Sequence, residues 1–247
     1  MSIYIENKRR KIDSIKEQYP GVDKEDILDL TSKSKYAQIL SPFYPHGNIP
    51  IPFSGRCTAT CVEAVWQGLK VFENCGVDKE TFHNATMKNL KRTVRKYGPP
   101  RGHQKGLYSN ELLDYFQARI LIYLPTYEWM LENVDSVISL VKRISQRAKE
   151  KDLVFLDYNT NYDYKDTSSP LSHAGLLKLY IEGKYPHPTE NDHPYTSEEI
   201  AAIKTKRKAK KKNVKSKKKK ENNTQQLSLF EQSQISGDSE INGVKLQ

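Results

Sequence analysis

Residues 61–72 read Cys-Val-Glu-Ala-Val-Trp-Gln-Gly-Leu-Lys-Val-Phe, and this stretch is the most informative part of the sequence for the fold. A threonine precedes it at Thr58 and again at Thr60, and threonine is a good helix N-cap because its hydroxyl accepts from a free backbone N–H. The sequence therefore predicts a helix that runs from this cap to about Asn74.

Three polar side chains share one face of this predicted helix. Glu63, Gln67 and Lys70 stand at positions i, i+4 and i+7, so they project from the same side over two turns. Cys61 and Trp66 lie along the same stripe and make its surroundings partly apolar. A carboxylate, an amide and an amine could converge there on a ligand. An ordinary exposed helix face is the alternative that spacing alone leaves open.

The segment before this helix, residues 41–55, reads Ser-Pro-Phe-Tyr-Pro-His-Gly-Asn-Ile-Pro-Ile-Pro-Phe-Ser-Gly. Its four prolines and two glycines exclude a helix, and its aromatic residues indicate an ordered loop of the kind that lines pockets. Phe43, Tyr44 and Phe53 could stack on a purine base, although aromatic side chains more often belong to a core.

The remaining pattern predicts an α+β fold: a mainly helical single globular domain with a small β component. The predicted helices cover residues 5–18, 24–30, 79–97, 109–119, 127–149 and 174–181. Residues 120–124 form a short apolar run, and residues 153–158 read as a buried strand.

Charge divides the chain into a nearly neutral body and a basic tail. The formal net charge is +10, and 12 of the 40 Lys and Arg residues lie between Lys204 and Lys220, with no acidic residue among them. We therefore predict a globular domain over residues 1–203, a disordered lysine-rich arm over 204–220 and a disordered tail over 221–247. The arm could contact nucleic acid phosphates nonspecifically, or it could be a solubilising linker or a localisation signal.

The tail contains one apolar motif, Gln226-Leu227-Ser228-Leu229-Phe230. It matches the short linear motif by which bacterial replication and repair proteins bind the DNA sliding clamp. Burial of the two leucines and the phenylalanine would contribute roughly 1.5 to 3 kcal/mol each before ordering costs. This motif makes the sliding clamp a candidate partner, and a chance cluster of apolar residues is the alternative.

The three cysteines, Cys57, Cys61 and Cys75, are too few for a disulfide framework, and the chain has neither a signal-peptide pattern nor an apolar run approaching 18 residues. We expect no membrane association and a cytoplasmic location, with the nucleoid or a viral replication site as possible places. Neither a metal nor a cofactor is expected, because a zinc site needs paired ligand clusters. A cysteine nucleophile at Cys61 remains an alternative without an identified histidine partner.

Residues 61–72 resemble the signature helix of the NADAR family, in which Val-Glu, three residues ending in an aromatic, Gln, two residues, Lys and an aromatic-apolar pair recur. The loop that begins at Ser41 is similar to the family's Ser-Asn-Phe loop. Weaker similarities lie at residues 91–102, at Asp157 and Asp163, and at residues 174–177. The family's Trp-Gly after its acidic pair is absent, so the chain resembles a divergent branch.

The resemblance implies an N-glycosidase that acts on ADP-ribose or a related ribosyl phosphate, with ADP-ribosylated guanine in DNA as the first candidate substrate. Lys70 matches the family's lysine, which attacks ribose C1 and forms a Schiff base. Glu63 is then suited to acid and base catalysis and Gln67 to orientation. Asp157 and Asp163 are further acid or base candidates, with turn capping as the alternative for each.

Binding of an ADP-ribose-like ligand also needs phosphate donors and a stacking surface. Arg101, Gly102 and His103 follow two prolines and could form a phosphate cradle, or they could be a basic surface turn. Trp66 and Phe43 are the aromatic candidates for substrate binding. Two other functions stay open: an N-glycosidase for small phosphorylated metabolites of the riboflavin-pathway type, and a nonenzymatic accessory protein that binds the clamp or DNA.

Overall fold

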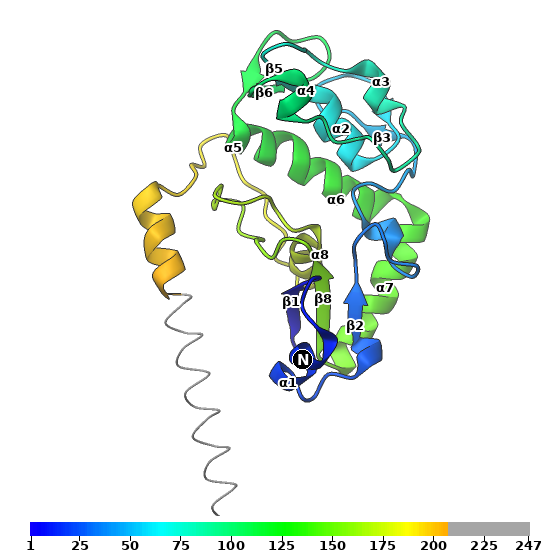
Figure 1. The fold of residues 1–247 in the computed structure, drawn as a ribbon. Coiled ribbons are helices and arrows are strands. Elements are labelled where there is room, and N and C mark those ends of the chain that lie inside the picture. The colour runs from blue at the N-terminus through cyan, green and yellow to red at the C-terminus, as the bar shows by residue number, and fades with distance from the viewer. Residues whose placement is uncertain (207–247) are drawn as a thin grey trace, which may run out of the picture. The chain divides into compact units, whose positions relative to one another are not determined.

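The structure is a computed structural model, and it describes residues 1–206 (Figure 1). The predicted α+β class is confirmed. Residues 1–194 form one compact unit, which is shorter than the predicted domain of 1–203, and residues 197–206 are helical and belong to a separate unit. Most of the lysine-rich arm and the whole motif at 226–230 lie outside the described residues.

A three-stranded parallel sheet anchors the compact unit. Its central strand is β8 (Leu153–Asp157), flanked by β1 (Ile3–Asn7) and β2 (Ile27–Asp29). Because all three strands run in the same direction, their carboxyl ends meet at one edge of the sheet. The predicted buried strand at 153–158 is confirmed.

Both faces of β8 are buried, which explains its continuous apolar sequence. Leu153 and Phe155 face the main core, whereas Val154 and Leu156 pack with Ile15 of α1 (Ile12–Gln18) in a smaller cluster. Helix α8 (His173–Ile181) contacts β8 and confirms the predicted short apolar helix.

The other half of the unit contains two small antiparallel sheets around α2 (Val62–Leu69). The first pairs β3 (Ile49–Pro50) with β4 (Thr58–Ala59). The second has the order β5 (Lys70–Phe72), β6 (Pro100–Gln104) and β7 (Leu112–Leu113). Helix α2 is thus enclosed by short strands formed on both sides of it in the sequence (Figure 1).

A long helical segment packs against α2 and comprises α5 (Tyr115–Ala118), a π-helical turn η3 (Arg119–Tyr123) and α6 (Leu124–Asn133). Asp114 and Gln117 begin it with a capping box. Pro125 lacks the N–H that would bond to the carbonyl of Leu121, and a wider turn accommodates its ring. The apolar run at 120–124 therefore belongs to this turn.

Several predicted helix boundaries were wrong. Residues 5–18 divide into β1 and α1, because Ile3–Asn7 pairs with β8 over its full length. Residues 24–30 divide into the 3₁₀ turn η1 (Lys24–Asp26) and β2. Both segments form strands because they pair with β8, which lies more than 120 residues away in the sequence. Local periodicity cannot predict such a distant pairing.

The predicted helices at 79–97, 109–119 and 127–149 are also interrupted. The first is only α3 (Lys79–Phe82) and α4 (Val94–Tyr97), and Met87 and Asn89 between them adopt positive φ angles. The second begins at Asp114 rather than Ser109, after β7. The third breaks at Val134, whose extended backbone separates α6 from α7 (Asp135–Glu150). A further 3₁₀ turn, η2 (Gln38–Leu40), precedes the proline-rich loop.

Within residues 1–206, no helix combines the length and the apolar character needed to cross a membrane.

Candidate functional site

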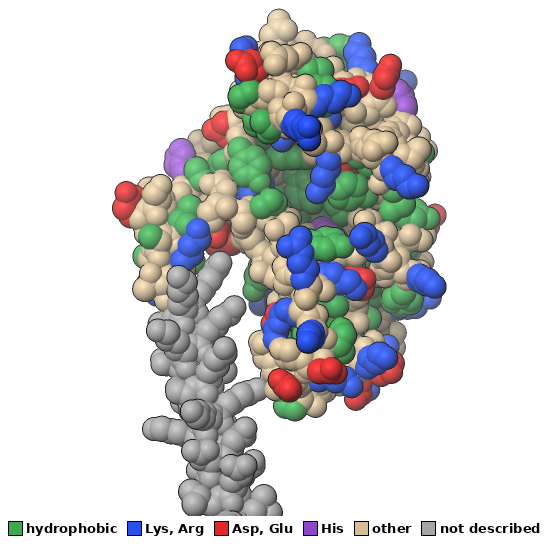
Figure 2. Space-filling model, in the orientation of Figure 1, with side chains coloured by type: hydrophobic (Ala, Val, Ile, Leu, Met, Phe, Trp, Pro, Cys, Tyr) green, Lys and Arg blue, Asp and Glu red, His purple; other side chains and the backbone are tan. Residues whose placement is uncertain are grey.

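A cavity of about 570 Å³ opens between α2, the α5–α6 segment and the carboxyl edge of the parallel sheet. Figure 2 shows one face of the molecule hollowed, with apolar side chains inside the hollow and Lys and Arg side chains around its edge. Thr31 and Ser32 follow β2, and Tyr158 and Asn159 follow β8, so the sheet edge supplies one wall. Ligands of open α/β sheets bind at this same edge. Six of the predicted site residues line the cavity: Phe43, Glu63, Trp66, Gln67, Lys70 and Asp157.

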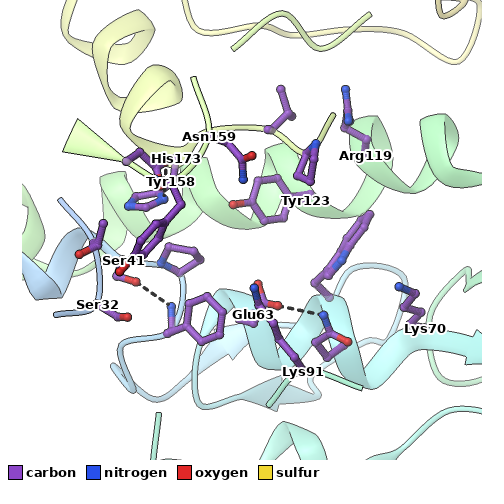
Figure 3. A pocket seen from close by; sticks show the side chains of 18 of the residues that line it. Ser32, Ser41, Glu63, Lys70, Lys91, Arg119, Tyr123, Tyr158, Asn159 and His173 are labelled. Carbon is purple, nitrogen blue, oxygen red and sulfur yellow. Dashed lines mark hydrogen bonds and ion pairs between the residues drawn. The ribbon is translucent and has the colours of Figure 1, made fainter. Parts of the chain in front are cut away.

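Glu63 projects into this cavity from the first turn of α2 (Figure 3). Its backbone N–H donates to the carbonyl of Pro42 at 2.8 Å, which ties the helix to the proline-rich loop. The residue is only 7% exposed, and its Oε1 accepts a hydrogen bond of 2.9 Å from Gln67 Nε2. Burial raises the pKa of Glu63, against the opposing effects of Gln67, Lys91 and Lys70. The site therefore favours the protonated carboxyl more than water does.

Lys70 reaches the cavity from a different element than predicted. Helix α2 ends at Leu69, and Lys70 begins β5, opposite His103 of β6. Its Nζ lies 5.2 Å from the ring centroid of Phe72, and among the described residues it forms no ion pair. Burial lowers the pKa of Lys70, and Arg92 lowers it further, whereas Glu63 raises it. The predicted single helical face was wrong at Lys70, yet the three polar groups share one cavity.

Gln67 has a fixed orientation between two neighbours. Its Oε1 accepts from the backbone N–H of Arg92 at 3.1 Å, and its Nε2 donates to Glu63. Because a main-chain N–H can only donate, the amide oxygen must face Arg92 and the amide nitrogen must face Glu63. The prediction that Glu63 and Gln67 share a helix face is confirmed by this bond.

Asp157 lines the cavity, but it is held as an anion. Its Oδ2 lies 3.0 Å from His173 Nδ1 and accepts from Ser172 Oγ at 2.7 Å. Burial alone would raise the pKa of Asp157; the charge and hydrogen bond of His173 outweigh it and hold the pKa at about 2. His173 also faces the carbonyl of Leu30 through Nε2 at 2.8 Å, and its own pKa is raised by Asp157 against the effect of burial. This ion pair is suited to fixing the sheet edge rather than to exchanging protons at neutral pH.

Four predicted site residues lie outside the cavity lining. Arg101 is exposed on β6, and His103 is buried with its ring centroid 3.9 Å from that of Trp66. Burial and Lys70 lower the pKa of His103 to about 3, so it is neutral. A Cβ on Gly102 would lie 2.4 Å from a backbone oxygen of β7, so this glycine permits strand pairing. The predicted phosphate cradle is a strand, because residues 100–104 bridge β5 and β7.

Asp163 is a turn residue. Its Oδ1 accepts from the backbone N–H of Lys165 at 3.1 Å, and it does not line the cavity. The turn-capping alternative describes its placement.

The polar residues on the cavity lining that the sequence did not mark as site residues include Lys91, Arg119, Tyr123 and Asn159. Tyr123 belongs to the run that was read only as apolar, and its hydroxyl faces the cavity in Figure 3. Arg119 is 2% exposed and donates to the carbonyls of Tyr164, Asp166 and Ser169, so it also fixes the loop that follows β8. No local motif marks these residues, since distant packing brings them together.

The cysteine alternative has little structural support. Cys61 Sγ accepts from the backbone N–H of Ala64 at 3.3 Å, and burial raises the pKa of this thiol to about 11. It acts as the N-cap of α2, in place of the predicted threonine. In the described part of the chain, no group of three or more His, Cys, Asp or Glu side chains could hold a metal ion.

The Asp157–His173 pair predicts a pH-dependent contribution to stability. The raised pKa of His173 contributes stability below about pH 6.5, and this contribution is lost as the pH rises through the pKa of the folded state. The lowered pKa of Asp157 contributes stability above about pH 4, and this contribution is lost on acidification toward pH 2. Replacing His173 with Gln leaves a buried carboxylate unpaired, and we expect a loss of roughly 3 kcal/mol near pH 5.5. Urea unfolding across pH 2.5–8 measures the difference in stability between the wild type and His173→Gln, which should shrink at both ends of this range.

His187→Gln, at an exposed histidine, is the control with little effect. A His173→Gln deficit that stayed constant from about pH 3 to pH 8 would contradict the ion pair.

Comparison with known proteins gives one match. Residues 7–177 match the model of a family described as "Family of unknown function (DUF6939)", and this segment includes strands β2 and β8, helix α2 and the whole cavity lining. No match was found among curated proteins or among solved structures. Because the match covers more than half of the chain, the protein belongs to the DUF6939 family.

Proposed function

We propose that the chain is an N-glycosidase that releases ADP-ribose from an ADP-ribosylated nucleobase, with guanine in DNA as the first candidate. The observation that carries the proposal is the pairing of Glu63 and Lys70 on one cavity. The pKa of the buried carboxyl is raised and the pKa of the half-buried amine is lowered. Each group is shifted toward its neutral form, which is the form this reaction requires. The resemblance of residues 61–72 to the NADAR signature supports the same chemistry.

In the proposed reaction, neutral Lys70 attacks ribose C1 through Nζ. The bond from C1 to the base nitrogen breaks, and Glu63 gives its proton to the departing base. The Glu63 carboxylate then takes a proton from the secondary ammonium that the attack has formed at Nζ. The C1–O4 bond of the ribose ring breaks, this proton passes to O4, and a protonated Schiff base between Lys70 and C1 remains. Water attacks C1 with the Glu63 carboxylate as the base, the C1–Nζ bond breaks, and the lysine amine and ADP-ribose are released.

The cavity has the size and the lining for a ribosyl nucleotide. Its volume of about 570 Å³ lies within the range of small-molecule sites. Trp66, Phe43 and Tyr115 offer aromatic surface for a base. Lys91 lies with Nζ 5.5 Å from the ring centroid of Phe43 and can approach a phosphate beside that ring.

The tail would act as a tether in this proposal. Residues 226–230 would bind the sliding clamp, and the lysine-rich arm at 204–220 would contact DNA phosphates, so that local concentration rather than cavity affinity delivers the enzyme to DNA.

A product assay tests the proposal against its alternatives. The full chain is incubated with ADP-ribosylated DNA, with ADP-ribosylated guanosine and with a panel of phosphorylated ribosyl metabolites, and the products are identified by mass spectrometry. Release of ADP-ribose from the first two is expected, and a chain that ends at residue 225 should keep its rate on the free nucleoside but lose clamp binding. Turnover of metabolites alone would assign the small-molecule function. No turnover of any of them would favour a nonenzymatic accessory role and would contradict the proposal.

A further inference from the structure

Arg92 lies in the irregular segment between α3 and α4, and sequence reasoning did not single it out. Its side chain is buried, with 6% of the residue exposed. Buried arginine is rare unless its donors are used, and here the guanidinium donates to four different groups.

The guanidinium holds the junction between α2 and β5. Nη1 donates to the carbonyls of Gln67 at 3.1 Å and Lys70 at 2.5 Å, and Nη2 donates to the carbonyl of Gly76 at 2.8 Å and to Cys75 Sγ at 2.9 Å. The Gln67 carbonyl already accepts from the backbone N–H of Lys70, the C-cap of α2, so Arg92 adds a second donor there and a further bond to the Lys70 carbonyl just beyond the helix. The backbone of Lys70 is therefore anchored by Arg92 as well as by β6.

The main chain of Arg92 reaches the second reactive group. Its N–H donates to Gln67 Oε1, and Gln67 Nε2 in turn donates to Glu63 Oε1. An arginine anchored by four side-chain bonds presents this N–H in one place. The Glu63 carboxyl is thereby oriented through a single amide.

The charge of Arg92 also acts on Lys70 across an aromatic ring. The guanidinium carbon lies 4.9 Å from the ring centroid of Phe72, and Lys70 Nζ lies 5.2 Å from the same centroid. Asp78 is the ion-pair partner of Arg92, at 3.8 Å from Nε, and it is too far for a hydrogen bond. The guanidinium charge is thus only partly compensated, and it disfavours a second cation beside Phe72.

We infer that Arg92 is a positioning residue for the proposed reaction: its guanidinium fixes the Lys70 backbone and places a second positive charge beside the Phe72 ring that Lys70 Nζ also faces, while its main chain orients Glu63 through Gln67. This inference rests on the proposed function for its catalytic meaning. The effect of Arg92 on the protonation of Lys70 can be tested whether or not the protein turns over a substrate.

Three charged or titratable groups of the described chain lie near Lys70, and a test must separate their effects on its pKa. Glu63 on α2 favours the ammonium form, and Arg92 disfavours it. His103 on β6, opposite Lys70 in the ladder, is neutral because burial and Lys70 lower its pKa. Removal of the Arg92 charge should therefore raise the pKa of Lys70.

The test compares Arg92→Met, which removes the charge, with Arg92→Lys, which keeps a charge but loses the fork of donors. Lys70 protonation is read from the pH dependence of acetylation by limiting acetic anhydride, followed by mass spectrometry of the peptide that contains Lys70. In Arg92→Met we expect the labelling midpoint to move to higher pH, with about 3- to 10-fold slower labelling at a fixed pH below the midpoint. In Arg92→Lys the midpoint should stay near that of the wild type while glycosidase turnover falls, because the carbonyls are no longer held together.

Circular dichroism checks that each variant is folded, and Gln67→Leu provides a second variant in case Arg92→Met is not. Gln67→Leu removes the bridge to Glu63 and leaves the guanidinium in place, so turnover should fall. Loss of the Gln67 hydrogen bond also raises the pKa of Glu63, which reduces the carboxylate charge near Lys70, so the Lys70 midpoint should not move to higher pH. An unchanged Lys70 midpoint in folded Arg92→Met, or a midpoint at higher pH in Gln67→Leu, would overturn the inference. If no variant or wild type turns over any substrate while the midpoint still shifts in Arg92→Met, the proposed function fails and the positioning of Lys70 by Arg92 survives.

Discussion

Replacing Lys70 with alanine is expected to lower the release of ADP-ribose by about 10³-fold or more, because the variant lacks the amine that we propose attacks ribose C1. Lys70→Arg should be as inactive as Lys70→Ala. A guanidinium keeps the positive charge and much of the length of lysine, but it stays protonated and cannot attack. Single-turnover rates on ADP-ribosylated guanosine measure both variants.

A second cavity lysine provides the matched control. Lys91 is exposed and lies over Phe43, so Lys91→Ala should weaken binding and raise KM, with a much smaller effect on kcat. If Lys70→Arg kept the wild-type rate, the role of Lys70 would be electrostatic and a covalent intermediate would be excluded.

Glu63→Gln is expected to lower kcat by about 10²- to 10⁴-fold, since the amide cannot give a proton to the departing base. The substitution keeps the shape of the side chain, and its oxygen can still accept from Gln67. The wild-type rate should fall at high pH as Glu63 loses its proton, and the residual rate of Glu63→Gln should show no such fall. The pH dependence of kcat for the two proteins is the measurement.

Glu128→Gln is the matched control, because it replaces a carboxylate with a raised pKa that lies outside the cavity. Burial also raises the pKa of Glu128, on α6, but this residue does not line the cavity. Its replacement should leave the rate and the profile at high pH close to those of the wild type. A Glu63→Gln variant with the wild-type alkaline fall would show that another group supplies the proton.

The part of the site that the sequence predicts best is the part encoded locally. Glu63 and Gln67 lie one helical turn apart, and their hydrogen bond follows from that spacing. Lys70, only three residues further, departs from the helix because β6 pairs with it and Arg92 binds its carbonyl. Because β6 and Arg92 are both more than 20 residues from Lys70, the local sequence pattern could not predict where α2 ends.

The residues on the opposite wall of the cavity were even harder to predict from local sequence. Tyr123 and His173 come from segments that the sequence presented as apolar, and neither carries a motif. Asp157 was predicted from the family resemblance and from its place at the end of a buried strand, and it does lie at the sheet edge. Its pairing with His173, which holds it as an anion, depends on the packing of α8 against β8. The phosphate cradle predicted at Arg101 was inferred from residue types alone and became a strand through pairing with two neighbours.

Trapping the intermediate tests the central claim most directly. The wild type is incubated with ADP-ribosylated guanosine and sodium borohydride, digested and analysed by mass spectrometry. The account predicts a reduced ribosyl adduct on the peptide that contains Lys70, formed only while substrate turns over, and absent from Glu63→Gln at the same time points. Full turnover with no adduct on Lys70 would contradict it.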